Sequence, residues 1–95
     1  MRHYVLLKFK QGYFNDEIFN YTKTVFDSIG ILKDIRVVRV CRNCIDRDSN
    51  MDIMIEMEVN DEKALKSYLN HELHIAFANL VNDHLKSRVS FDCNI

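Results

Sequence analysis

Four segments of the chain alternate apolar and polar residues with a period of two. The alternation is clearest in residues 51–59 and recurs in residues 3–9, 34–41 and 88–93. This period places successive side chains on opposite faces of a strand, so each segment is expected to be a β-strand with one dry face. The sequence therefore predicts four strands, each half covered by other parts of the fold.

The alternation also predicts which side chains of the second and fourth strands point toward the core. Continued without interruption, it places Val37 and Cys41 on the covered face of the second strand and Val40 on the uncovered face. In the fourth strand it places Phe91 on the covered face and Arg88 on the uncovered face. Both assignments depend on an unbroken two-residue period.

Two other segments follow the period of an α-helix. Residues 15–29 carry apolar side chains on one helical face, with Asn15 as a plausible N-cap. Residues 61–85 carry two apolar arcs that do not join smoothly, so we expect a bend or break near Asn70–Glu72. The predicted order is strand, helix, strand, strand, helix, strand.

This order predicts an α+β fold, the ferredoxin-like βαββαβ arrangement. Short connections and right-handed crossovers give a four-stranded antiparallel sheet with both helices on one face. The other face is left uncovered by this chain. A length of 95 residues suits one domain with one core, so residues 1–95 are expected to form a single unit.

Composition narrows the possible partners and the cellular compartment. A formal net charge of −1 gives no reason to expect nucleic acid or a membrane surface as a partner. No apolar run approaches the roughly 20 residues that span a bilayer. Three cysteines are too few for a disulfide framework, which favours a reducing cytoplasm. No cofactor-binding motif is found, and we expect none.

Two motifs resemble metal sites. His71, Glu72 and His74 form a shortened version of the His-Glu-x-x-His zinc motif, but the i, i+3 spacing does not place the imidazoles as that motif does. Cys41 and Cys44 have a spacing that suits zinc or a dithiol redox pair. Neither motif has a convincing further ligand, so we expect no metal and favour a structural role, with the redox or zinc site as the alternative.

Three blocks of sequence, in this order, resemble the stress-responsive α/β-barrel domain (Dabb) family: "RHYVLLKFK", "YLNHELHIAF" and "VSFD". The resemblance covers nearly the whole chain. It implies a ferredoxin-like subunit that forms a homodimer through its sheet, so that two sheets close into a dimeric α/β barrel. Some plant members of that family act as polyketide cyclases, others are linked to stress tolerance, and many bacterial members have no assigned activity.

A candidate proton-transfer site consists of His3, Tyr68 and His74. In the expected fold all three can reach one end of a pocket between the helices and the sheet. A neutral imidazole can accept a proton and a tyrosine hydroxyl can stabilise an oxyanion, which suits enolisation or ring closure of a small, apolar, oxygenated substrate. The apolar residues expected to line this pocket are Val5, Leu7, Ile53, Ile55, Phe77, Val81 and Phe91.

Each of the three residues also has a structural explanation. His3 could bond a backbone carbonyl, His74 could bridge the helix break, and Tyr68 could be a core residue with a solvated hydroxyl. We expect His74 to face inward and His71 to be the more exposed histidine. The sequence leaves open whether the chain is an enzyme.

The uncovered sheet face mixes charges of both signs with apolar residues. Such a face suits either a monomer in which this side of the sheet is exposed to solvent or a dimer in which it is covered. The family resemblance favours the dimer. The apolar residues expected at the dimer contact are Tyr4, Leu6, Val38 and Met54. Two functions follow: a small-molecule-binding protein with possible cyclase-like chemistry, or a non-enzymatic stress or assembly module based on the dimer.

Overall fold

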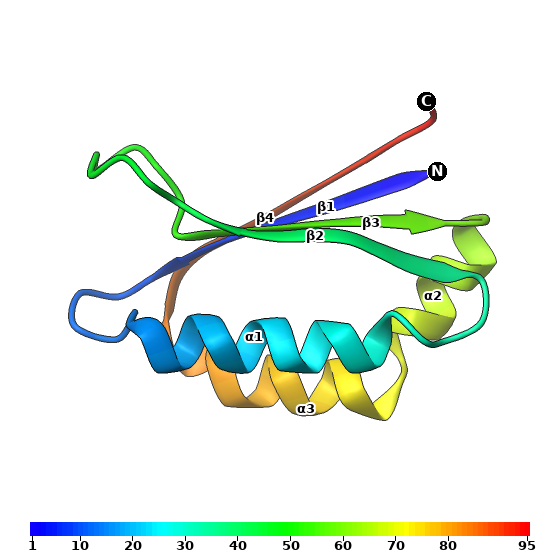
Figure 1. The fold of residues 1–95 in the computed structure, drawn as a ribbon, viewed down its shortest axis with the longest axis horizontal. Helices are drawn as coiled ribbons and strands as arrows, with labels where there is room; N and C mark the ends of the chain where they lie inside the picture. The colour runs from blue at the N-terminus through cyan, green and yellow to red at the C-terminus, as the bar shows by residue number, and fades with distance from the viewer.

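The structure is a computed structural model that describes all 95 residues. It confirms the predicted α+β order, with the second helical segment divided in two (Figure 1). None of the helices is long and apolar enough to cross a membrane. The elements are β1 (Arg2–Phe9), α1 (Asp16–Ile29), β2 (Ile35–Arg42), β3 (Ile53–Val59), α2 (Glu62–Leu69), α3 (Glu72–Val81), a 3₁₀ turn (Asn82–His84) and β4 (Leu85–Cys93).

The four strands form one antiparallel sheet in the order β2-β3-β1-β4. The helices cover one face of this sheet and leave the other face open, as Figure 1 shows. β1 and β3 are the central strands, and their alternate apolar residues point into the helix–sheet layer as predicted. The buried cluster consists of Val5, Leu7, Phe9, Phe26, Ile29, Ile53, Ile55, Met57, Tyr68, Phe77 and Val81.

Local capping explains where the helices begin. The side chain of Asn15 accepts a hydrogen bond from the Ile18 amide, and that of Asp61 accepts one from the Ala64 amide. Each satisfies an amide that the first turn of a helix leaves without a partner. The predicted break is confirmed, because α2 ends at Leu69 and α3 begins at Glu72.

A bulge in β2 makes the predicted facing of its second half wrong. The pairing with β3 shifts between Val37 and Arg39, so Val38 is an extra residue in the ladder. Beyond the bulge the alternation is inverted. Val40 packs against the core, whereas Cys41 pairs opposite Met54 on the open face.

The predicted facing of β4 is also wrong. The pairing of β1 with β4 shifts next to Phe9, and from there Arg88 pairs opposite Leu7, on the helix side. Phe91 pairs opposite Tyr4 on the open face and is 63% exposed. Phe91 therefore does not belong to the helix–sheet pocket. The residues of β4 show no local sign of the shift, because β4 is an edge strand with few buried side chains.

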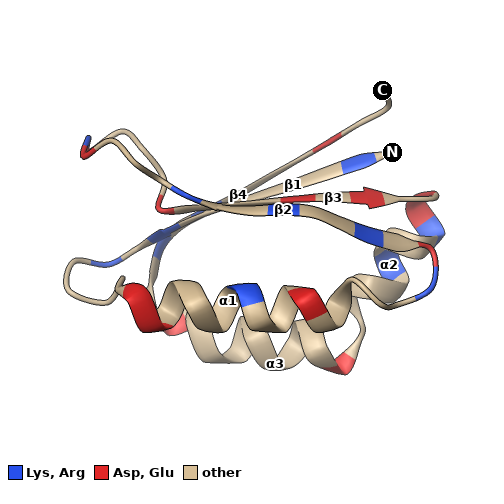
Figure 2. Ribbon diagram, viewed as in Figure 1, with Lys and Arg blue, Asp and Glu red and all other residues tan.

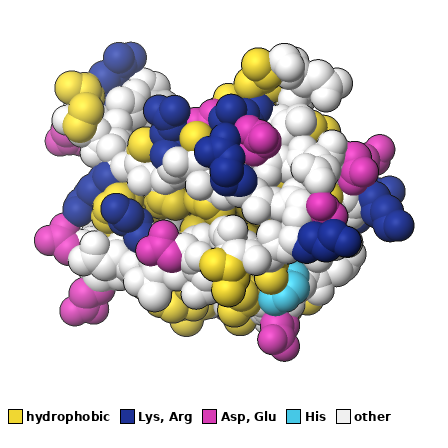
Figure 3. Space-filling model, turned by 45° about the vertical axis from the view of Figure 1, so that its right-hand side comes forward, with side chains coloured by type: hydrophobic (Ala, Val, Ile, Leu, Met, Phe, Trp, Pro, Cys, Tyr) yellow, Lys and Arg dark blue, Asp and Glu magenta, His cyan; other side chains and the backbone are white.

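The open face carries charges that are paired within the chain. Glu56 is buried there between Arg2 and Arg39, each at 2.8 Å, and also accepts a hydrogen bond from the Tyr4 hydroxyl. Figure 2 shows basic residues on β2, acidic residues on the neighbouring β3, and few charges on α3. Figure 3 shows basic and acidic side chains in contact on the sheet side and a hollow between two raised parts. These charges are thus paired inside one chain and need no partner from a second copy.

Candidate functional site

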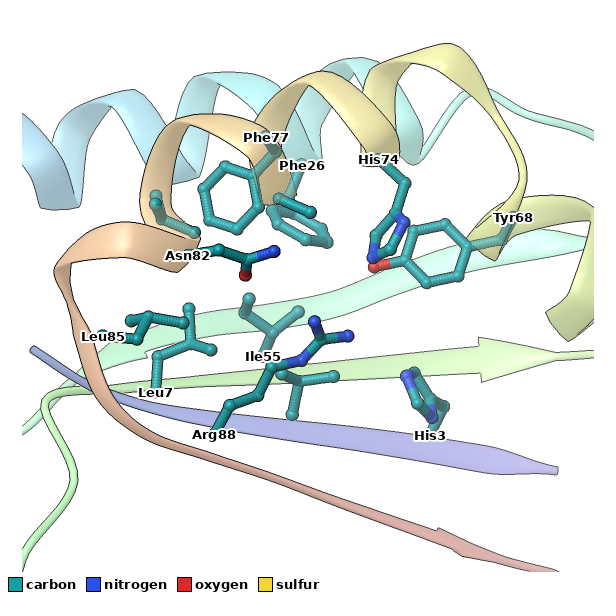
Figure 4. Close-up of a pocket in the computed structure, with 13 residues that line it drawn as sticks. His3, Leu7, Phe26, Ile55, Tyr68, His74, Phe77, Asn82, Leu85 and Arg88 are labelled. Carbon is teal, nitrogen blue, oxygen red and sulfur yellow. The ribbon is translucent and has the colours of Figure 1, made fainter.

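The site is a narrow cavity between α3 and the β1–β4 half of the sheet (Figure 4). Most of its lining is apolar, and its polar side chains are His3, Tyr68, His74, Asn82 and Arg88. The space open to the centre of a water molecule is about 20 Å³. That is close to the room one water needs, so a larger ligand requires the walls to move apart.

His3 is held in the cavity wall by a carboxylate on the neighbouring strand. The His3 Nδ1 lies 2.5 Å from Oδ1 of Asp92, the residue that pairs opposite it on β4. An ionised carboxylate can only accept, so Nδ1 carries the proton and donates it. Nε2 is the ring nitrogen that this contact leaves free. His3 is only 4% exposed, so its ring is fixed by packing as well.

His74 is oriented by the end of the preceding helix. Its Nδ1 lies 2.9 Å from the carbonyl oxygen of Leu69, the last residue of α2. A carbonyl can only accept, so Nδ1 is again the donor and Nε2 the lone-pair nitrogen. Burial lowers the pKa of His74, the Leu69 carbonyl opposes that shift, and the positive charge of Arg88 adds to it. His74 is therefore neutral at pH 7.

Tyr68 lies between the two histidines. Its ring packs edge-on against His74, with centroids 4.8 Å apart, and against His3, with centroids 6.1 Å apart. Tyr68 is 2% exposed, and burial raises the pKa of its hydroxyl well above the ordinary value. The hydroxyl makes no hydrogen bond to another protein group, and Figure 4 shows it directed into the cavity beside His74.

Three polar residues of the site were missed from the sequence. Asp92 orients His3, while Arg88 and Asn82 contribute a guanidinium and an amide to the cavity lining. Arg88 and Asp92 were missed because the facing of β4 is inverted relative to the simple alternation. The pairing of β4 with β1 would have revealed them, since Asp92 lies opposite His3 and Arg88 opposite Leu7.

The predicted apolar lining is partly correct. The cavity is lined by Val5, Leu7, Ile55, Phe77 and Val81 as expected. Ile53 is buried in the core but does not reach the cavity, and Phe91 lies on the other face of the sheet. Three apolar residues that were not expected also line the cavity, namely Phe26, Ala78 and Leu85.

The two histidines at the start of α3, His71 and His74, have different roles. His71 is the N-cap of α3, where its Nδ1 accepts a hydrogen bond from the Leu73 amide at 3.1 Å. His74 faces the cavity as predicted. Both are half-buried, so the expected difference in exposure is not seen. Of the two histidines in the shortened zinc motif, one therefore caps a helix and the other lines the cavity.

The cysteines lie away from this cavity. Cys41 is on the open face, Cys44 is exposed in the following loop, and neither forms a disulfide. His74 lies in the helix layer, on the other side of the sheet from Cys41. No three His, Cys, Asp or Glu residues come together in a geometry that could hold a metal ion.

The geometry therefore supplies two imidazoles, each hydrogen-bonded through Nδ1, and one protonated phenol around one space. Each imidazole presents Nε2 as a proton acceptor, because its Nδ1 proton is already engaged. The Tyr68 hydroxyl stays protonated over the ordinary pH range and can donate a hydrogen bond. This combination suits proton abstraction next to a carbonyl whose oxygen is held by the phenol.

Solved structures with the same fold come from several organisms. A dimeric ferredoxin-like protein of unknown function from Bacteroides fragilis is 21% identical, with 99% of this chain and 94% of that chain covered at a TM-score of 0.83. A Dabb family protein from Mesorhizobium loti is 18% identical, with 99% and 94% covered at 0.76. A hydroxynitrile lyase from Passiflora edulis is 12% identical, with 98% and 92% covered at 0.75.

The family comparison is more direct. No curated protein matches the chain at a significant level. Residues 1–95, the whole chain, match the stress-responsive A/B barrel domain. The fold, the strand order and this match agree, so the chain belongs to the stress-responsive A/B barrel (Dabb) family.

Proposed function

We propose that the protein binds a small, apolar, oxygen-bearing molecule in the cavity and transfers a proton next to its carbonyl group. The observation that carries this proposal is the convergence of His3, Tyr68 and His74 on one largely apolar space. Residues far apart in the sequence meet there, and each has its proton position set by a separate contact or by burial.

The roles follow from the protonation states. The Tyr68 hydroxyl donates to the substrate carbonyl oxygen, where negative charge develops as the enolate forms. Nε2 of His74 or of His3 accepts the proton from the adjacent carbon. The ring then returns that proton to the product, at carbon or at oxygen, so no external oxidant or reductant is needed. The hydroxynitrile lyase of the same fold supports an enzymatic role.

The apolar wall selects the substrate class. Phe26, Phe77 and Ile55 surround the polar groups, so a polar or highly charged molecule would lose solvation without compensation. An apolar ring or branched chain with one or two oxygen atoms fits the chemistry. The walls must open to admit it, because the space in the free protein holds little more than a water.

Deuterium exchange tests this proposal. 2-Tetralone is an apolar ketone with moderately acidic C–H groups, and NMR in D₂O follows their exchange. The protein should accelerate this exchange, and Tyr68→Phe and His74→Gln should each reduce the acceleration by about tenfold or more. Tyr13→Phe and His84→Gln are matched controls, because these two rings stack on each other outside the cavity.

The outcomes separate the two explanations of the site. Equal exchange with and without protein, or equal loss in the control variants, would contradict the proton-transfer function. Thermal unfolding of every variant shows whether a loss of exchange reflects a loss of folding. If His74→Gln lowers only stability, the imidazole serves the helix joint and not a substrate.

A second proposed property is a homodimer that buries the open sheet face, which is also the basis of the non-enzymatic alternative. The charges of that face are satisfied within the chain, and Phe91 and Val89 remain 63% and 48% exposed. Apolar side chains this exposed on one face favour association. Similar folds from Bacteroides fragilis and Thermobifida fusca are described as dimeric.

A further inference from the structure

Arg88 differs from the other arginines of the sheet. Its side chain lines the cavity, and Figure 4 shows the guanidinium between Asn82 and the pair formed by His74 and Tyr68. Arg88 forms no ion pair and no hydrogen bond with another residue. Carboxylates of the chain do pair with Arg2, Arg36, Arg39 and Arg42.

The cavity around Arg88 contains no group that could balance its charge. No Asp or Glu lines it, and the Asp92 carboxylate that bonds His3 is outside the lining. The charge also acts on its neighbours, because Arg88 lowers the pKa of His74 and counteracts the rise in the pKa of Tyr68. Arg88 is thus a solvent-exposed cation in the cavity lining that no carboxylate of the chain pairs with.

The position of this charge fits a second functional group on the ligand. A guanidinium presents parallel N–H groups that match the two oxygens of a carboxylate. Arg88 comes from β4 and His74 from α3, so a ligand that contacts both would bridge the two layers. The Asn82 amide next to Arg88 offers a further donor in the cavity lining.

We propose that the cavity selects an apolar monocarboxylate, with the ligand carboxylate paired to Arg88 and its apolar part against the aromatic wall. This inference rests on the proposed function, because it assigns the substrate class of the same cavity. It adds that the carbonyl substrate carries an acidic group, as an aromatic or branched oxo acid does. The acid anchors one end of the molecule and leaves the other end for Tyr68 and His74.

Phenylacetate and phenylacetamide test the inference, because they share ring and shape and differ in charge. Binding is measured by NMR titration, following the His74 ring and the Arg88 side chain. The wild-type protein should bind phenylacetate about tenfold more tightly, as expected for a charge-assisted pair. Arg88→Gln should weaken phenylacetate binding about tenfold and leave phenylacetamide binding unchanged. Lys86→Gln, an exposed cation on the same strand, is the control and should keep the preference.

The possible results distinguish the carboxylate site from the proton-transfer function. Equal affinity for the two probes, a preference that survives Arg88→Gln, or no binding of phenylacetate at millimolar concentration would overturn the inference. If the Arg88-dependent preference is found but 2-tetralone exchange is not accelerated, the carboxylate site stands and the proton-transfer function fails. If exchange depends on Tyr68 and His74 but the probes bind equally, the function stands and the assignment of the ligand as an acid fails.

Discussion

At the scale of single residues, the chemistry of the cavity depends on where two protons are held. His3 donates a hydrogen bond from Nδ1–H to the Asp92 carboxylate, and His74 donates one from Nδ1–H to the Leu69 carbonyl. The two partners differ in kind. A carboxylate on an edge strand can be exchanged for another side chain, whereas a backbone carbonyl cannot. The two histidines can therefore be perturbed independently.

The tautomer of His3 should depend on Asp92. In the wild-type protein at pH 8, we expect the Nδ1–H form, because the carboxylate accepts only from that nitrogen. Asp92→Asn offers both a donor and an acceptor, so the preference for Nδ1–H should weaken. Long-range ¹⁵N–¹H NMR of the imidazole distinguishes the tautomers. A wild-type spectrum dominated by Nε2–H would contradict the assignment, and the spectrum of His74 provides an internal control.

His74 should make folding stability depend on pH. Burial lowers its pKa in the folded state below the ordinary value of 6.5. Below about pH 6.5 the unfolded chain therefore binds more protons, and stability falls as the pH is lowered further. Urea unfolding at pH 7.5 and 5.5 should show a smaller loss in His74→Gln than in the wild type. His84→Gln should keep the wild-type loss, and an unchanged loss in His74→Gln would refute the prediction.

At the scale of elements, the joint between α2 and α3 positions the site. His71 caps α3 in this joint, Tyr68 lies in the last turn of α2, and His74 bonds back to Leu69. Two short helices with a fixed joint place Tyr68 and His74 side by side, where one continuous helix would separate them by nearly two turns. The break is thus a requirement of the site.

The cap of α3 can be improved. Histidine is not among the preferred N-cap residues, which are Ser, Thr, Asp and Asn. His71→Asp should raise stability by about 0.5–1 kcal/mol, because a carboxylate also interacts favourably with the helix N-terminus. His71→Ala should lower stability by about 1 kcal/mol. Thermal and urea unfolding measure both changes, and a stabilising His71→Ala would show that the Leu73 amide needs no cap.

The regularity of each element also explains which features could be predicted from the sequence. The facing of β1 and β3, the helix break and the meeting of His3, Tyr68 and His74 all follow from local periods. Such periods hold while a strand is regular. The bulge at Val38 and the shifted pairing of β4 each add one residue to a strand. Beyond that residue, every side chain of the strand points to the opposite face of the sheet from the one expected. Only the partner strand contains that information, which is why Phe91 was misplaced and Arg88 and Asp92 were missed.

At the scale of the whole molecule, one layer of helices covers one face of the sheet and leaves the other face open. Its charged residues are paired inside the chain, so association need not form new ion pairs. The predicted contact residues Tyr4, Leu6 and Met54 lie on this face, and Phe91 joins them there. Val38 is half-buried within the bulge.

The proposed homodimer should therefore depend on apolar contacts. Phe91→Arg should convert a dimer at micromolar concentration into a monomer, because the charge would be buried without a partner. Leu80→Arg is a matched control, since Leu80 is 50% exposed on the helix layer. Light scattering measures the mass of each variant. A wild-type monomer, or a dimer that tolerates Phe91→Arg, would rule out this contact.

The small size of the cavity affects the kinetics of ligand binding. A space for about one water can admit a substrate only after the surrounding helices and strand move, so encounter and accommodation become separate steps. Association should then be slower than diffusion allows, and its observed rate should level off as ligand concentration rises. Stopped-flow mixing with a tight ligand would reveal this plateau. The rate at the plateau would be the rate at which the closed protein opens, and it would set an upper limit on turnover.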